Sequence, residues 1–83
     1  MIRPTSNVQN TAHMIATSIV DDRKITLRAI GAGAVNQAVK ATVQARQKLA
    51  SQGENLYIIP GMVTVDGGQG EEVTAVVLHC LLS

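Results

Sequence analysis

Aromatic side chains are almost absent from this chain: Tyr57 is the only one, and there is no Trp or Phe. Proteins that hold single strands by stacking successive bases need several aromatic rings on one surface, so this class is excluded. Charge is also sparse, with 16% charged residues and a formal net charge of +1. A strongly basic nucleic-acid binder, whose affinity comes mainly from neutralising phosphates, is therefore not indicated.

Cysteine occurs once, at Cys80, which excludes an internal disulfide and offers no partner at zinc-ligand spacing. Cys80 lies in the apolar run VTAVVLHCLLS, so we predict a buried free thiol. Apolar runs of the ~20 residues that a membrane-spanning helix needs are missing. The segment MIRPTSNVQN also lacks the apolar core of a signal peptide, and we expect a cytoplasmic protein.

Catalytic groups in a recognisable arrangement are missing as well. His13 and His79 have no cysteine or acid at ligand spacing, and neither has a nucleophile or partnered acid beside it. Glu71 and Glu72 are adjacent, so on a strand they point to opposite faces and read as edge residues that discourage aggregation. The sequence predicts a protein that is not an enzyme, with no cofactor and no metal.

What is present is a short and moderately apolar chain. Its 83 residues, 46% of them hydrophobic, predict a single domain over residues 1–83. A domain of this size buries only about 60% of the surface that its unfolded chain exposes. It therefore needs a well-packed core or the support of an oligomer.

Two helices are predicted from apolar residues at helical spacing. The first follows a capping box of Ser6 and Gln9 and ends at Asp21 and Asp22. The second spans residues 34–50. The residues expected to face the core are Val8, Ala12, Ile15, Ala16 and Ile19 in the first helix, and Val35, Ala38, Val39, Thr42, Val43 and Leu49 in the second.

Four strands are predicted, at residues 1–4, 24–30, 56–67 and 71–82. The third contains Pro60, which cannot donate to a ladder, so it is an edge strand or is broken there. The last two are joined by the glycine-rich tip DGGQG, residues 66–70. The order β-α-β-α-β-β predicts a two-layer α+β domain with two helices on one face of a mixed four-stranded sheet.

The last strand is apolar on both faces, although two helices can cover only one. Val73, Ala75, Val77 and Leu81 alternate with Val76, Leu78, Cys80 and Leu82. The second apolar face needs a cover, and another copy of the chain is the simplest one. We therefore predict a homodimer or a larger homo-oligomer.

Gly31 and Gly33 lie in the segment RAIGAGAVNQAVKA, between a predicted strand and a predicted helix. A dinucleotide site is disfavoured, because its third glycine falls at Asn36 and no acid follows at the end of a next strand. The Walker A lysine and serine are absent too. Two interpretations stay open: a turn needed for close packing, and a modest anion site at the helix start, helped by Arg28 and Lys40.

The segment AIGAGAVNQAVKA, together with IIP at residues 58–60, resembles the stage V sporulation protein S family. The similarity runs over nearly the whole chain and is most specific from Ala29 to Ala41. That family in turn resembles the Alba superfamily of small β-α-β-α-β-β nucleic-acid-binding proteins, which dimerise. The resemblance implies an Alba-like fold and a bacterial regulator that is tied to development in spore formers.

The leading functional hypothesis is a non-enzymatic regulator that binds nucleic acid weakly and without sequence specificity. Its expected contacts with nucleic acid are Arg3, Arg28, Asn36 and Lys40. The tip at residues 66–70 is expected to contact a groove of the nucleic acid. The alternative is a protein-interaction or assembly module that regulates development through a protein partner. Convergence of Arg3, Arg28 and Lys40 on one face would favour nucleic acid, whereas scattering would favour the assembly module.

Overall fold

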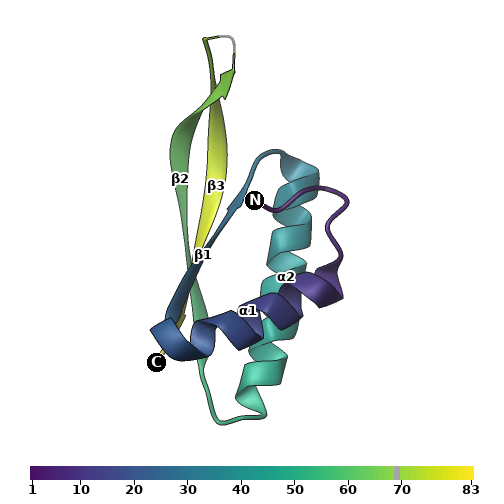
Figure 1. Cartoon of the computed structure of the whole chain (residues 1–83), viewed down its shortest axis with the longest axis vertical. Coiled ribbons are helices and arrows are strands. Elements are labelled where there is room, and N and C mark those ends of the chain that lie inside the picture. Colours follow the sequence, from purple (N-terminus) through teal and green to yellow (C-terminus); the bar gives the residue numbers. More distant parts are fainter. Residues whose placement is uncertain (69) are drawn as a thin grey trace.

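Two helices cover one side of a sheet in the computed structural model, which describes residues 1–68 and 70–83 (Figure 1). Gln69, within the predicted hairpin tip, lies outside the described residues. The α+β class and the placement of both helices on one face are as predicted. The elements in chain order are α1 (Val8–Asp22), β1 (Lys24–Ala29), α2 (Ala32–Ala50), β2 (Leu56–Gly68) and β3 (Glu71–Leu82).

The sheet has three strands in the order β1-β3-β2, and both pairings are antiparallel. The predicted fourth strand at residues 1–4 does not form. Only Ile2 reaches the sheet, through a parallel bridge to Ala29 in which its N–H donates to the Arg28 carbonyl at 2.8 Å. The chain then turns away, because the Arg3 N–H donates to the Ser6 hydroxyl at 2.9 Å and Pro4 has no N–H to offer.

The N-cap of helix α1 lies one residue later than the predicted cap, Ser6. Asn7 is its cap, and the Asn7 side chain accepts from the Asn10 N–H at 2.9 Å. Ser6 is used instead in the turn that precedes the helix. At the other end Arg23 adopts a left-handed conformation with φ 64°, and its N–H donates to the Ile19 carbonyl.

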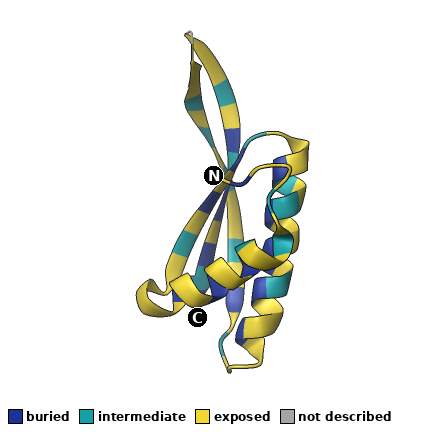
Figure 2. Cartoon of the chain, turned by 45° about the vertical axis from the view of Figure 1, so that its right-hand side comes forward, coloured by how far each residue is buried: buried dark blue, intermediate teal, exposed yellow. Residues whose placement is uncertain are grey.

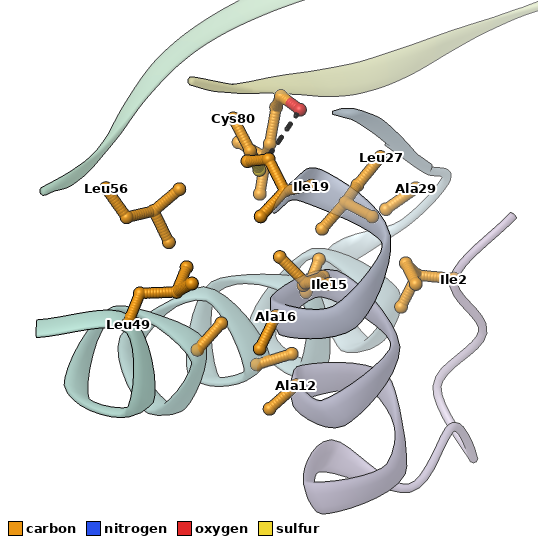
Figure 3. Packing of buried hydrophobic residues seen from close by; sticks show 14 of the residues in the cluster. Ile2, Ala12, Ile15, Ala16, Ile19, Leu27, Ala29, Leu49, Leu56 and Cys80 are labelled. Atoms are coloured by element: carbon orange, nitrogen blue, oxygen red, sulfur yellow. Dashed lines mark hydrogen bonds between the residues drawn. The ribbon is translucent and has the colours of Figure 1, made fainter. Parts of the chain in front are cut away.

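The core is built from alanines between the helices and from larger side chains against the sheet (Figure 3). Ile15, Ile19, Leu49, Leu56 and Cys80 are the largest side chains that are fully buried. Small side chains let two helix backbones approach closely, which suits a domain with few bulky residues. The buried alanines of the two helices are Ala12, Ala16, Ala34, Ala38, Ala41 and Ala45.

The predicted inner face of α2 is partly wrong. Val39 and Val43 are 44% and 52% exposed, whereas Ala34, Ala41 and Ala45 are buried. The helix is rotated so that its alanine stripe, rather than Val39 and Val43, faces α1 and the sheet, while Val35 is partly buried against the core as predicted. Thr42 is buried as predicted, and its hydroxyl donates to the Val39 carbonyl at 2.7 Å.

Strand β2 is an edge strand, as Pro60 predicted, and it runs through Pro60 without a break. Its register with β3 is regular from Leu56 to Asp66 and shifts only between Asp66 and Gly68. The missing N–H of Pro60 is tolerated because a strand at an edge has one side without a ladder partner.

The β2–β3 hairpin extends well beyond the rest of the domain (Figure 1). Strand β1 ends where Ala29 pairs with Val76, so residues 63–68 and 71–75 form a two-stranded projection, here called the arm. The remainder is called the body. Figure 2 shows that buried residues concentrate in the body, whereas most of the arm is exposed.

Neither helix within the described residues is long and apolar enough to cross a membrane.

Candidate nucleic-acid interface

The N-terminal segment, residues 2–6, lies across the end of β1 and the start of α2. Besides the Ile2 bond to Arg28, the Gln37 side-chain amide donates to the Ser6 carbonyl at 2.9 Å. Pro4 lies against Gly33, since a Cβ on Gly33 would come within 3.1 Å of the Pro4 Cβ. These contacts bring Arg3 close to the glycine turn, which sequence spacing alone does not predict.

Gly31 and Gly33 serve different purposes in this turn. Gly31 has φ 88° and ψ 156°, a backbone region that is essentially restricted to glycine, and a Cβ there would meet nothing within 4 Å. Gly33 lies inside the first turn of α2, where the Pro4 contact leaves little room for a side chain. Close packing thus explains Gly33, and backbone conformation explains Gly31. The open space beside Gly31 is compatible with the predicted anion site.

Asn36 and Lys40 both lie exposed on α2, four residues apart and therefore on one side of the helix. Asn36 is in the second turn, near Gly33 and the N-terminal segment. Lys40 is one turn further on. Since a helix N-terminus carries partial positive charge and free N–H groups, this end of α2 favours an anion.

Arg28 does not join this group. The residues of β1 that face the helices are Ile25, Leu27 and Ala29, so the Arg28 side chain projects from the opposite face of the sheet. Its backbone is bonded to Ile2, yet its guanidinium is separated from α2 by the sheet. Of the four predicted contacts, Arg3 is the chain neighbour of Pro4, which packs against the start of α2. Asn36 and Lys40 share one side of α2, and Arg28 lies apart.

Arg23 is engaged in the structure of the body. Its guanidinium forms an ion pair with Glu54 at 3.0 Å and donates to the Ser83 carbonyl at 3.3 Å. These contacts tie the end of α1 to the loop before β2 and to the end of β3. Because these two partners hold the Arg23 guanidinium, it is poorly placed to bind a phosphate.

Charge is divided between the two halves of the chain. All seven lysines and arginines lie in residues 1–48. Residues 49–83 contain no lysine or arginine and four acids, three of which stand near the end of the arm: Asp66, Glu71 and Glu72. The arm therefore repels phosphate, which disagrees with the predicted insertion of its tip into a groove.

Groups of three or more metal-ligating side chains are not found in residues 1–68 and 70–83. Burial raises the pKa of the Cys80 thiol to about 11, so it is protonated and unreactive near neutral pH. His79 faces away from the helices, with Nδ1 3.3 Å from the Thr26 hydroxyl. That pair has no carboxylate or nucleophile in hydrogen-bond contact among the described residues.

A family model described as stage V sporulation protein S (SpoVS) matches residues 1–82. The chain belongs to the SpoVS family. The resemblance read from the glycine turn and from residues 58–60 is thereby confirmed. Membership places the chain among sporulation-related regulators. Gly31, Gly33, Asn36 and Lys40 all lie inside the matched range.

Proposed function

We propose that this SpoVS-family regulator is non-enzymatic and binds nucleic acid weakly through one end of its body. The binding surface is the start of α2 with the N-terminal segment, and its contacts are Arg3, Asn36 and Lys40. The observation that carries the proposal is the Pro4–Gly33 contact, which brings a basic residue up to a helix start that favours anions. Arg28 is left out, because its side chain projects from the other face of the sheet.

The contacts named are to phosphates and sugars, so they position the duplex without reading its sequence. The surface has few charges. Each phosphate neutralised by a lysine or arginine contributes about 0.9 to the slope of log affinity against log salt, so the two cations of this surface, Arg3 and Lys40, give a slope of about −2 per subunit. If two copies present their surfaces together, the slope doubles.

The test is a titration with duplex DNA and duplex RNA at two salt concentrations, comparing Lys40→Glu with Lys48→Glu. Both lysines are exposed on α2 and both changes alter the net charge equally, but Lys48 is in the last turn, about 12 Å further along the helix. Lys40→Glu should weaken binding to every sequence alike, and Lys48→Glu should weaken it less. Equal weakening by both variants would contradict the assigned surface.

An assembly module is the second candidate, and the position of Arg28 favours it. Arg3, Arg28 and Lys40 do not converge on one face, and Val39 and Val43 are exposed on α2. A protein partner that contacts α2 would then carry the regulation. Absence of nucleic-acid binding at low salt, with circular dichroism showing a folded protein, would select this candidate.

A further inference from the structure

Strand β1 forms one edge of the sheet, and part of its backbone is unpaired (Figure 1). In an antiparallel ladder, the N–H and C=O groups of alternate residues point toward the partner strand. The alternation is fixed by the Leu82 N–H, which donates to the Arg23 carbonyl at 3.0 Å. The residues whose groups point away from β3 are therefore Lys24, Thr26 and Arg28. Apart from the Arg28 carbonyl, which accepts from the N-terminal segment, these groups have no hydrogen-bond partner within residues 1–68 and 70–83.

The other edge of the sheet, β2, is blocked by Pro60. The Ser83 N–H donates to the Asn55 carbonyl at 3.0 Å, and alternation from Asn55 puts the missing N–H of Pro60 on the outward side. A proline on an exposed edge hinders pairing with a further strand. Strand β1 has neither a proline nor a shift in register, so it is the edge that can accept another strand.

A groove of about 420 Å³ lies beside β1 on the side of the helices, and is here called the edge groove. Its apolar lining is formed by Met1, Ile2, Met14, Ile25 and Leu27. Met14 comes from α1 and is 39% exposed. Methionine side chains adapt to apolar partners of different shapes. In a strand added to β1, the side chains level with Ile25 and Leu27 point toward this groove.

The opposite face of β1 is basic. Lys24 and Arg28 project from it on either side of Thr26, and neither forms an ion pair within residues 1–68 and 70–83. A residue of an added strand that is level with Thr26 lies between the two cations, which favours an acidic side chain there. A second copy of the chain pairing through the same edge would instead bring lysine and arginine side chains together, which disfavours it.

We propose that the outer edge of β1 binds an extended peptide of a protein partner, in which an acidic residue lies between two apolar ones. The peptide backbone pairs with the outward groups of β1, the apolar side chains enter the edge groove, and the acid faces Lys24 and Arg28. Only the segment from Lys24 to Leu27 is free, because Ile2 already bridges to Ala29. The contacts proposed for nucleic acid take no part, so the inference goes beyond that function and does not depend on it.

The test is an NMR titration of the isotope-labelled chain with a blocked peptide that has valine–glutamate–valine at its centre and glycine and serine at its ends. The amide signal of Thr26 should shift and its hydrogen exchange should slow. Lysine in place of the peptide glutamate should weaken binding by about fivefold. Absence of any shift at Thr26 with millimolar peptide would overturn the proposal.

N-methylated peptides test the strand pairing itself. One version is methylated at both valines and the other at the glutamate. Only alternate N–H groups of an added strand face β1, so one version should lose binding and the other should keep it. Equal effects of the two methylations would show that the peptide does not extend the sheet.

Variants of the chain locate the site. Thr26→Pro should lose binding, because it removes an outward N–H, whereas Thr26→Val keeps this N–H and should bind like the wild type. Met14→Asp should weaken binding more than Val20→Asp, since both residues are exposed on α1 but only Met14 lines the edge groove. Circular dichroism establishes that each variant is folded, and the methylated peptides decide the case if Thr26→Pro is not. A folded Thr26→Pro variant that binds as tightly as Thr26→Val would contradict the assigned edge.

Discussion

The body and the arm are made from the same two strands but are stabilised in different ways. In the body, β2 and β3 lie under two helices, and side chains such as Leu56 and Cys80 are fully buried. In the arm they have no third strand, and most side chains are exposed. The body also holds every lysine and arginine, whereas the tip of the arm is acidic. Folding free energy therefore comes mainly from the body, and the arm depends on it.

The largest effect on the free energy of unfolding is expected from a substitution in the core of the body. Ile15→Ala truncates a fully buried side chain of α1 that packs in the core. This should lower the free energy of unfolding by about 2–5 kcal/mol. Thr64→Ala, at an exposed position of the arm, should change it by less than about 1 kcal/mol. Urea denaturation measures both. Similar losses for the two variants would show that the arm is as important to stability as the core.

A second comparison uses thiols placed in the two regions. Burial raises the pKa of Cys80 from 9.0 to about 11, so the folded state holds this proton more tightly than the unfolded chain. Below pH 9 the buried neutral thiol therefore contributes on the order of 2 kcal/mol to the free energy of unfolding. This contribution is lost as the pH rises from 9 to 11. Denaturation across this range should show the loss, and Cys80→Ala should remove it.

The matched variant carries Thr74→Cys in the arm together with Cys80→Ala. Thr74 is exposed, so a thiol there should react rapidly with a thiol reagent at pH 8, whereas Cys80 in the wild type should react slowly. Equal rates would mean that the sheet of the body opens as easily as the arm.

A smaller effect is expected from two glycines with positive φ. Gly31 in the body and Gly68 in the arm have φ 88° and 92°, and a Cβ on either would meet nothing within 4 Å. Gly31→Ala should cost about 1–3 kcal/mol of backbone strain. Gly68→Ala should cost less, because the arm can relax or open without unfolding the body. Thermal denaturation followed by circular dichroism distinguishes them, and a larger loss at Gly68 would reverse the comparison.

Much of the fold could be predicted because strand alternation and helical spacing are local properties. The inner face of α1, the edge position of β2 and the two-sided apolar character of β3 all follow from them. The orientation of α2 followed only in part: Ala38, Thr42 and Leu49 are buried as predicted, but the helix also packs on Ala41 and Ala45, which a pattern dominated by valine does not single out. Alanine is common on inner and outer faces alike, so only the tertiary packing decides.

The arrangement of the candidate site was harder to predict from the sequence than the fold was. Alternation along β1 already puts Arg28 on the face opposite to Leu27, so its separation from α2 could have been anticipated. The position of Arg3 could not, because it depends on contacts that Pro4 and Ser6 make with α2, about thirty residues away along the chain. The role of Arg23 likewise depends on Glu54, a partner in a distant loop.

The most direct test of the division between body and arm is a duplex titration at one low salt concentration with three proteins. These are the wild type, Lys40→Glu, and the arm variant Glu71→Gln with Glu72→Gln. Lys40→Glu should bind more weakly than the wild type, and the arm variant should bind at least as tightly, since it loses only repulsive charge. Weaker binding by the arm variant, with Lys40→Glu unchanged, would show that the arm rather than the body contacts nucleic acid.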